Sequence, residues 1–467
     1  MVLADRETIS STGVVNDLSD EKSVALGGTN FTVRFCRETG ALVSYVRNGE
    51  EHLAAPMTVD AFRAPVPNDG GLGRRWMEAG LHDLVETATS ISPVETNADG
   101  SKSVTIVADV RGRNAKPHSP RFIVARKWTV FGDGLVACQS EIRPRGRVME
   151  LARIGYRFTL AIDSYTAMWL GAGPHENYPD RKSSAHTSLW TQCDWQMVER
   201  YAKPQDMGNR ENTYVAVVYP NAAEKPRKSA FIVTTLGEPF SFSAIPYSPM
   251  ELVRAAHPEE LPEMSKVELG IFVAVRGLGG ASCGPGPLGR DIVRNDRTYR
   301  LDFVIGKTGM GNKLPAMPPA ALPPDVRTGE DIIPVVVACT SAEPGEGDAD
   351  HLVDGDLSTI WHSQYGVTLT KYPHAVTVDL GRVAKAKGVT IWQRQNGPNG
   401  NIKDFRFEVS ENGKAWREVV SGELKATTAA QTFAFAGTVP VRFWRFTGLN
   451  EHLGREFASL AEIRIEE

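Results

Sequence analysis

The sequence predicts an all-β protein of two domains. Short runs in which apolar and polar residues alternate recur along the chain, and a period of two is typical of strands with one buried face. Helical periodicity is scarce, and five prolines between Pro315 and Pro324 separate two strand-rich regions. Because such a stretch favours extended polyproline conformation over packing, we place the domain boundary there.

The alternating runs predict antiparallel sheets on both sides of that boundary. In the first region they are FTVRF (31–35), SVTIVADV (103–110), RFIVARKWTV (121–130), TYVAVVYP (213–220), SAFIVTT (229–235), FSFSAI (240–245), VELGIFVAV (267–275) and TYRLDFVIG (298–306). In the second region they are HAVTVDLG (374–381), KGVTIWQ (387–393), FRFEVS (405–410), TFAFAG (432–437), RFWRFTG (442–448) and AEIRIEE (461–467). Asn412-Gly413 is a hairpin turn signal, and Ser248-Pro249-Met250-Glu251 is a capping box that predicts a short helix.

Composition and charge exclude several classes of protein. At roughly 150 residues per domain, 467 residues leave room for about three structural units, and 41% hydrophobic with 23% charged residues is typical of a folded globular chain. The net charge of −4 comes without a basic stripe, so we expect no nucleic-acid partner. We also expect no membrane span and no signal peptide, since the chain has neither an eighteen-residue apolar run nor a basic start followed by an apolar core.

Cysteine usage and helix content exclude two further architectures. Five scattered cysteines without a C-x-x-C pair predict small buried thiols rather than a disulfide framework or a zinc site. A (β/α)₈ barrel needs roughly 250 residues of alternating strands and helices, and the chain has no such stretch.

Five ordered segments of the first region carry a resemblance to a known family. They are RAPVPNDGG (63–71), GPHENYPDR (173–181), PQDMGNRE (204–211), PYSPMELVRAAH (246–257) and GLGGASCGP (277–285). In order and spacing they resemble the carboxy-terminal small-chain domain of the large beta-galactosidases of glycoside hydrolase family two. The resemblance implies an antiparallel supersandwich similar to galactose mutarotase, beside a catalytic barrel whose two glutamates are not in this chain.

The same resemblance implies a loop and a turn that border an active site. It assigns the loop to Asn68, Asp69, Gly70 and Gly71 and the turn to the region of Cys283, where many members carry an aromatic residue. Polar turn residues and glycines predict a long surface loop between Phe62 and Gly80. Without a neighbouring barrel, we expect the part from Asp69 to Trp76 to be exposed and mobile.

His175, Glu176 and His257 offer an acid and a base for an independent enzyme of the epimerase or lyase type. Adjacent residues of a strand point to opposite faces, so an extended segment would not direct both His175 and Glu176 to one ligand. The alternative, which we prefer, is that Glu176 and Arg181 stabilise a turn through an ion pair.

An acidic loop in the second region is a candidate metal site. Residues 346–356 hold five carboxylates, and clustered hard oxygen ligands favour Ca²⁺, although a solvated acidic loop is the simpler alternative. The segments DGDLSTIWHS (354–363), YPHAVTVDLG (372–381), RQNGPNGNIKDFRFEVSENGKAW (394–416) and ASLAEIRI (458–465) resemble the F5/8 type C, or discoidin, domain, called carbohydrate-binding module family 32 in glycosidases. This resemblance implies a jelly-roll β-sandwich with a structural Ca²⁺ held by Asp354, Asp356, Thr359 and Glu462.

Sugar recognition needs an aromatic face and a few rigid polar groups. The candidates are Gln364, Tyr365, Arg394, Asn396, His452, Arg455 and Phe457. Trp361 and Trp392 lie in strand-like runs, so we expect both to pack in the core.

These observations predict an N-terminal extension (1–24), a small-chain domain (25–310), a linker (311–334) and a carbohydrate-binding domain (335–467). We expect an accessory, noncatalytic region or small subunit of a beta-galactosidase, with a beta-galactoside-containing glycan and a separate catalytic barrel as partners. The alternatives are a stand-alone carbohydrate-binding protein and an independent mutarotase-like enzyme. Sequence does not fix the compartment; a glycan-degrading bacterium would suggest the periplasm or the exterior.

Overall fold

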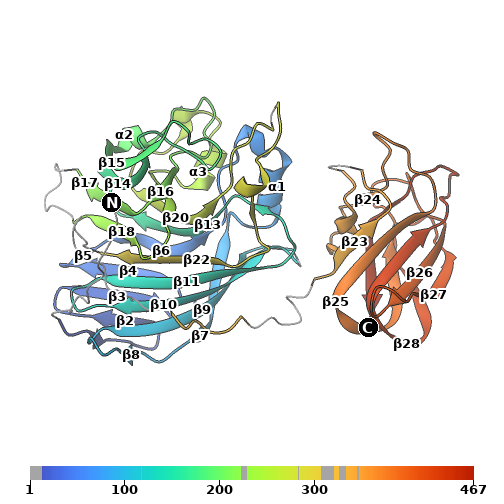
Figure 1. Cartoon of the computed structure of the whole chain (residues 1–467), viewed down its shortest axis with the longest axis horizontal. Coiled ribbons are helices and arrows are strands. Elements are labelled where there is room, and N and C mark those ends of the chain that lie inside the picture. The colour runs from blue at the N-terminus through green and yellow to red at the C-terminus, as the bar shows by residue number, and fades with distance from the viewer. Residues whose placement is uncertain are drawn as a thin grey trace. The chain divides into compact units, whose positions relative to one another are not determined.

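The computed structural model describes residues 13–116, 118–221, 229–281, 283–306, 320–325, 333–343 and 346–467. Strands dominate this part of the chain, and neighbouring strands in its sheets are antiparallel (Figure 1). The all-β prediction is therefore confirmed. The chain divides into two compact units, one ending at Asp325 and one formed mainly by the residues after it, and each is described by itself.

The first unit contains three large sheets. A five-stranded sheet has the order β1-β2-β3-β4-β5, a second has the order β16-β19-β20-β13-β6, and a ten-stranded sheet has the order β15-β14-β17-β18-β22-β11-β10-β9-β7 with β8 paired to β9. The strands are β1 (Asn16–Asp17), β2 (Ser23–Gly27), β3 (Phe31–Cys36), β4 (Leu42–Arg47), β5 (Glu50–Glu51), β6 (Leu53–Asp60), β7 (Leu84–Ile91), β8 (Glu95–Thr96), β9 (Lys102–Gly112), β10 (Arg121–Val130), β11 (Val136–Arg145), β13 (Arg153–Leu160), β14 (Tyr165–Gly173), β15 (His186–Cys193), β16 (Arg210–Thr213), β17 (Val215–Pro220), β18 (Phe231–Thr235), β19 (Phe240–Ile245), β20 (Val267–Val275) and β22 (Tyr299–Ile305), with β12 (Glu150–Leu151) and β21 (Val293–Arg294) forming a separate pair.

The period-two pattern explains how these strands pack. In β3 the alternate residues Phe31, Val33 and Phe35 are all buried. Phe35 lies 5.0 Å from Trp128 of β10 between ring centroids, and Trp128 meets Phe303 of β22 edge to face at 6.1 Å. One hydrophobic core therefore joins two of the sheets.

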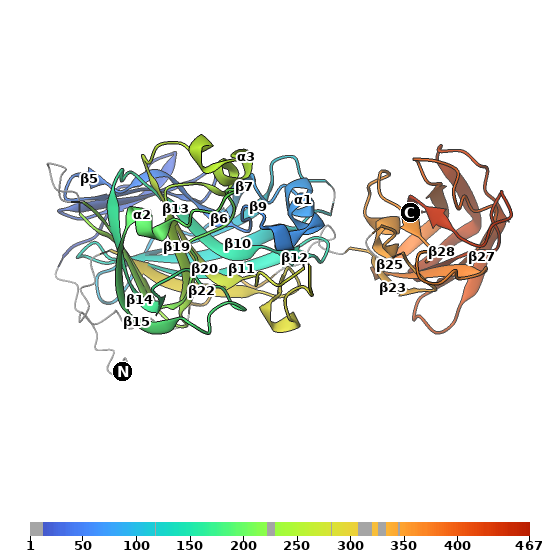
Figure 2. The same ribbon diagram turned by 90° about the horizontal axis from the view of Figure 1, so that it is seen from above.

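The helices of the first unit are short (Figure 2). They are α1 (Gly71–Glu78), α2 (Asp194–Met197) and α3 (Pro249–Arg254), with 3₁₀ turns η1 (Pro67–Asp69), η2 (Pro258–Glu260) and η3 (Gly289–Asp291). The predicted capping box is present at α3, because the Ser248 side chain accepts from the Glu251 amide and the Glu251 carboxylate accepts from the Ser248 amide.

The second unit is a smaller β-sandwich. Its six-stranded sheet has the order β23-β25-β28-β26-β27 with β30 paired to β25, and β24 pairs with β29. The elements are β23 (Val335–Cys339), η5 (Ala349–Val353), β24 (Trp361–His362), β25 (His374–Trp392), β26 (Asp404–Ser410), β27 (Arg417–Glu423), β28 (Gln431–Gly448), β29 (Ser459–Leu460) and β30 (Glu462–Glu466). Trp361 is buried in the core as predicted, whereas Trp392 is only half-buried, with the Arg464 guanidinium 5.1 Å from its ring. The Asn412-Gly413 turn joins β26 to β27, with Gly413 at a φ of 72°.

Two predicted segments lie partly outside the described residues. Of the N-terminal extension (1–24), residues 13–24 carry β1 and the start of β2. Of the linker (311–334), residues 320–325 and 333–334 are described. The carbonyls of Pro323 and Pro324 accept from the Arg143 guanidinium of β11, so the described end of the proline-rich segment is attached to the first unit.

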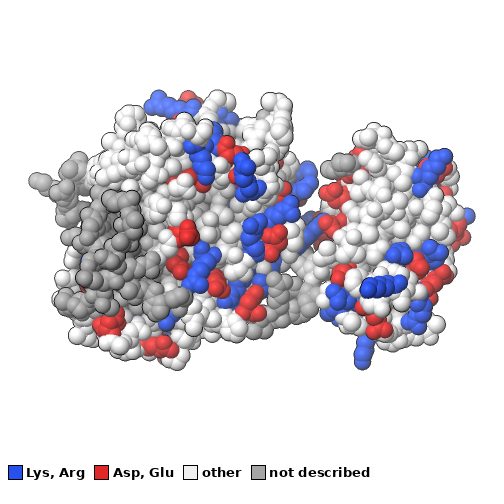
Figure 3. Space-filling view, viewed as in Figure 1, with Lys and Arg blue, Asp and Glu red and all other residues white. Residues whose placement is uncertain are grey.

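The surface carries charged side chains of both signs. Basic and acidic side chains are interspersed on the face seen in Figure 3. Within the described residues, no helix has the length and apolar character needed to span a membrane.

The expectation of five buried thiols is wrong: Cys138 is buried, Cys283 is exposed, and the other three are intermediate. Cys283 lies in a glycine-rich turn in which residues 283–286 are all exposed.

Candidate functional site

The segment predicted as a long exposed loop is instead folded and partly buried. Residues Pro67–Asp69 form η1 and Gly71–Glu78 form α1, while Asp69 and Trp76 are 4% and 0% exposed. Trp76 explains the difference, because its ring meets Phe62 edge to face at 6.4 Å and its Nε1 donates to the Glu150 carbonyl at 2.8 Å. These tertiary contacts stabilise a helix whose local sequence, with two glycines, favours a loop. Gly70 and Gly71 remain exposed.

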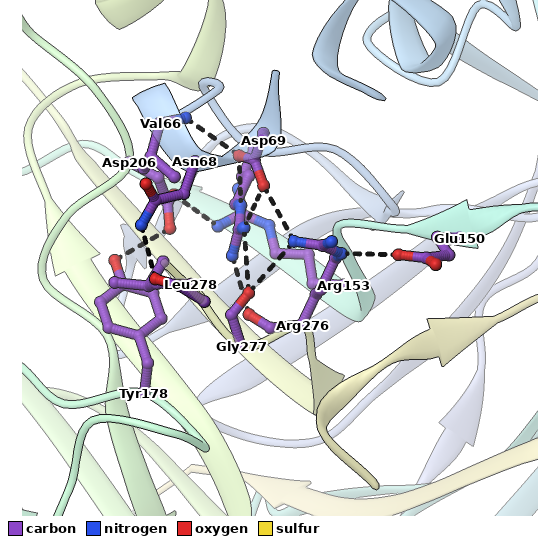
Figure 4. Close-up of polar contacts among 12 residues, drawn as sticks. Val66, Asn68, Asp69, Glu150, Arg153, Tyr178, Asp206, Arg276, Gly277 and Leu278 are labelled. Carbon is purple, nitrogen blue, oxygen red and sulfur yellow. Dashed lines mark hydrogen bonds and ion pairs between the residues drawn. The ribbon is translucent and has the colours of Figure 1, made fainter. Parts of the chain in front are cut away.

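The Asp69 carboxylate is the centre of a buried ion-pair network (Figure 4). It accepts from Arg63 Nη2 at 2.6 Å and Nε at 3.2 Å, from Arg276 Nη1 at 3.2 Å and from the Val66 amide at 2.9 Å. Arg276 also donates to the Glu150 carboxylate at 3.0 Å. Since Arg276 lies 207 positions from Asp69 along the chain, the network joins two distant segments.

A glycine-rich turn at residues 277–279 is held by side chains from two other segments of the chain. The Asp180 carboxylate accepts from the Leu278 amide at 2.9 Å and from the Gly279 amide at 2.7 Å, and Asn68 Nδ2 donates to the Gly279 carbonyl at 2.5 Å. At Gly277 a Cβ would lie 2.5 Å from Asp180 Oδ2, so any other residue would have to displace the carboxylate that holds the turn. We call Arg63, Asn68, Asp69, Asp180 and Arg276 the clamp.

A second group of buried charges lies next to the clamp. Arg153 pairs with Asp60 at 3.1 Å and with Asp206 at 3.2 Å, and Tyr178 donates to Asp206 at 3.0 Å. Burial raises the pKa of Asp206 despite Arg153 and Arg63, whereas Arg153 and Arg157 outweigh burial and lower the pKa of Asp60. The two carboxyl groups share Arg153 but have pKa values shifted in opposite directions.

Glu176 stabilises a turn, as predicted. It is 6% exposed, accepts from the Gly208 amide at 2.9 Å and pairs with the Arg181 guanidinium and the Tyr201 hydroxyl. Burial and then Glu176 raise the pKa of Tyr201 to about 12. His175 Nε2 instead contacts Ser184 Oγ at 2.9 Å, so the two side chains are held by different partners.

In the second unit three aromatic side chains, two of them predicted sugar-binding residues, lie in contact. Tyr365 lies 6.5 Å and His362 5.3 Å from Phe457 between ring centroids, and Tyr365 meets His362 edge to face at 4.7 Å. We call His362, Tyr365 and Phe457 the platform. His362 was missed by sequence reasoning, because a histidine directly after a core tryptophan in a short strand gives no signal of its own.

Polar groups surround the platform. The Arg455 guanidinium lies 4.9 Å from the Phe457 ring and donates to Glu451 at 2.8 Å and to Asn399 at 3.0 Å. Arg394 donates to Asn396 at 2.6 Å. Burial and then Arg394, opposed by the bond to the Ser363 carbonyl, lower the pKa of His362.

The remaining sugar candidates are placed differently. His452 Nε2 contacts the Leu424 carbonyl at 2.8 Å. The backbone amide of Gln364 donates to Ser341 Oγ at 3.2 Å, and the backbone carbonyl of Gln364 accepts from the Thr370 amide at 3.4 Å. The structure thus joins Tyr365, Arg455 and Phe457 directly through ring contacts.

Hydrogen bonds connect the segments that carry the four predicted calcium ligands. Thr359 Oγ1 donates to Asp354 Oδ2 at 2.9 Å and lies 2.8 Å from the Asp356 carbonyl, while the Gly355 amide donates to Glu462 Oε2 at 3.2 Å. Glu462 is 4% exposed and comes from the last strand. Carboxylate, hydroxyl and carbonyl oxygens are ligand types that suit Ca²⁺, but Asp356 turns only its backbone carbonyl toward Thr359, while its carboxylate accepts from the Ser358 amide and hydroxyl. Among the described residues there is no group of three or more His, Cys, Asp or Glu side chains arranged to hold a metal.

Comparison with known families assigns both units. The family described as beta galactosidase small chain matches residues 27–305, and the F5/8 type C domain matches residues 336–463. Similar curated proteins include a beta-galactosidase of Priestia megaterium (strain DSM 319 / IMG 1521), 29% identical over 56% of this chain and 24% of its own length, and one of Enterobacter cloacae, 27% identical over 58% and 26%. The chain therefore spans about a quarter of the length of these curated relatives.

Solved structures are similar to part of this chain. CpGH89CBM32-5 from Clostridium perfringens, in complex with GalNAc-beta-1,3-galactose, is 28% identical with a TM-score of 0.27, covering 29% of this chain and 95% of that one. The family 32 CBM of C. perfringens NanJ, in complex with galactose, is 26% identical with a TM-score of 0.26, covering 29% and 93%.

Proposed function

Because residues 27–305 make the chain a member of the beta-galactosidase small-chain family, we propose that it is an accessory, noncatalytic region or small subunit of a glycoside hydrolase family two beta-galactosidase. In this proposal the first unit completes the border of an active site that belongs to a separate catalytic barrel. The second unit binds a glycan that contains beta-galactoside. The proposal takes the substrate from relatives that are named beta-galactosidases.

The clamp is the observation that carries the role of the first unit. It connects two exposed segments through one set of hydrogen bonds and ion pairs. One segment holds Gly70 and Gly71, and the other is the turn that leads to Cys283. Two segments about 210 positions apart therefore form one rigid border. Small residues at its exposed positions leave space for a substrate or a partner domain to approach.

The platform is the observation that supports glycan binding by the second unit. Aromatic rings cover the apolar face of a pyranose, and rigid polar groups recognise its hydroxyls. Tyr365 and Phe457 supply the rings, and Arg394, Asn396 and Arg455 supply polar groups fixed by hydrogen bonds.

We further propose a structural Ca²⁺ in the second unit, held by Asp354, Asp356, Thr359 and Glu462. A bound ion would join the loop after η5 to β30, the last strand. Its role would be to stabilise the sandwich.

Activity measurements with a nitrophenyl beta-galactoside test the accessory role. We expect no turnover by the purified chain and turnover on mixing with a barrel-bearing partner. Asn68→Ala should lower the activity of the mixture, whereas Asn114→Ala, at an exposed position of the first unit remote in sequence from the clamp, is the matched control. Turnover by the chain alone, abolished by Glu176→Gln, would overturn the proposal and favour an independent enzyme.

Glycan binding by the full chain tests the second unit, and Phe443 offers a matched control. Arg455 lies 4.9 Å from the Phe457 ring and Arg442 lies 5.0 Å from the Phe443 ring, so the two pairs are alike. Phe457→Ala should abolish binding to immobilised beta-galactoside and Phe443→Ala should not. If both variants kept the same affinity for immobilised beta-galactoside, the platform would be excluded as the glycan-binding site.

A further inference from the structure

The loop from Gln364 to Thr370, sequence QYGVTLT, is fixed at both ends. The Thr370 amide donates to the Gln364 carbonyl at 3.4 Å, which closes the loop. The Glu343 carboxylate accepts from the Tyr365 amide at 2.7 Å and the Gly366 amide at 2.9 Å. A Cβ at Gly366 would overlap that carboxylate, so the loop lies directly against it.

This fixed loop presents apolar side chains to solvent. Tyr365, Val367 and Leu369 are 44%, 82% and 49% exposed, and residues 364–370 include no charged side chain. Contiguous exposed apolar groups on a held loop mark an interaction site. Tyr365 also belongs to the platform, and its hydroxyl donates to Glu346 at 2.6 Å. The apolar loop is therefore continuous with the platform.

We infer that the second unit binds glycosides with an apolar aglycone, the sugar on the platform and the aglycone against Val367 and Leu369. This inference rests on the proposed glycan binding. A protein partner fits poorly, because a stable protein interface buries about 800 Å² on each partner and the loop offers only three exposed apolar side chains. A short alkyl or aryl group fits the size of the loop.

The expected gain in affinity is about tenfold or more over the methyl glycoside. A tenfold gain corresponds to about 1.4 kcal/mol, which requires about 55 Å² of buried apolar surface at 25 cal/mol per Å². Two aliphatic side chains supply this area.

Isothermal titration calorimetry of the full chain with methyl, octyl and phenyl beta-galactosides tests the inference, with the octyl compound kept below its critical micelle concentration. The octyl and phenyl arms distinguish an alkyl from an aryl aglycone. Val367→Ser with Leu369→Ser should leave methyl binding unchanged and remove the advantage of the apolar glycosides. The matched control is Val383→Ser with Leu449→Ser, two residues of the second unit that are 54% and 44% exposed outside this loop; it should keep the advantage.

The outcomes separate this inference from the proposed function. Equal affinity for all three glycosides, or an advantage that survives in the loop double variant, would overturn the inference and leave glycan binding standing. No binding of any glycoside would overturn both. Binding of sugar-free phosphatidylcholine vesicles that is lost in the loop double variant, without an aglycone advantage, would assign the loop to a lipid surface and refute the inference.

Discussion

Asp69→Asn tests whether the clamp is an energetic centre of the first unit. The substitution keeps the shape of the side chain and removes its charge. Arg63, with a fully buried side chain, then loses the carboxylate that it pairs with and keeps neutral acceptors, the backbone carbonyls of Arg276 and Gly277 at 2.8 and 3.4 Å and the amide oxygen of the new side chain, whereas Arg276 retains Glu150. Removing one partner of a buried ion pair costs about 3–5 kcal/mol. At about 2 °C per kcal/mol for a unit of this size, thermal unfolding of the first unit should shift down by about 6–10 °C.

Differential scanning calorimetry of the full chain measures this shift, and Asp83→Asn is the matched control. Asp83 pairs with Arg113 at 3.0 Å, but the two side chains are 46% and 62% exposed. An exposed pair contributes about 0–1 kcal/mol, so the control should move the transition by no more than about 2 °C. Hydrogen exchange should accelerate at residues 66–70 and 276–279 in Asp69→Asn alone. Equal shifts for the two variants would refute the assignment of Asp69 as the centre of the clamp.

Three further predictions concern the turn, the metal and the pH dependence. Gly277→Ala should lower the free energy of unfolding of the first unit by about 1–3 kcal/mol in denaturant unfolding, because its Cβ would overlap Asp180. Gly286→Ala, with open space around it, should change that free energy by less than about 0.5 kcal/mol, and equal effects of the two variants would contradict the packing argument. Ca²⁺ at a hundredfold excess over its dissociation constant should stabilise the second unit by about 2.7 kcal/mol, a shift that Asp354→Ala removes and Arg394→Ala keeps, and a melting temperature unaffected by chelator would disprove the site. Burial lowers the pKa values of His362 and His374 from 6.5, so the folded state binds fewer protons than the unfolded state, and the second unit should lose stability as the pH falls from about 6.5 toward the folded pKa values. Hydrogen exchange of β25 should report this loss, and an unchanged pH dependence in the His362→Gln, His374→Gln double variant would show that these two histidines do not cause it.

Features encoded by neighbouring residues were predictable from the sequence. The capping box at Ser248 and Glu251 spans four residues, and the Asn412-Gly413 turn spans two. Alternation in runs such as Phe31 to Phe35 predicts the buried face of a strand without knowledge of its neighbours. The all-β class follows from repetition of these local signals.

Features decided by distant residues were not predictable. The helix at Gly71–Glu78 contains two glycines, and it depends on Trp76 reaching the Glu150 carbonyl 74 positions away. Asp69 is buried because Arg276 meets it from another part of the chain. His362 joins the platform only because the chain brings Phe457 back beside it. Local propensity favours a loop in the first case and gives no signal in the others, so tertiary contacts decide all three.

The clamp also bears on how an accessory unit would contribute under the proposed function. A mobile loop must lose conformational entropy when it orders against a partner, which reduces the net gain from the contact. Here the buried charges of Arg63, Asp69 and Arg276 have already ordered the segment next to Gly70, and Asp180 has ordered the turn. A partner that meets this border would meet a preorganised surface. The first unit would therefore act through fixed geometry, and the cost of ordering that border would fall on its own folding rather than on association.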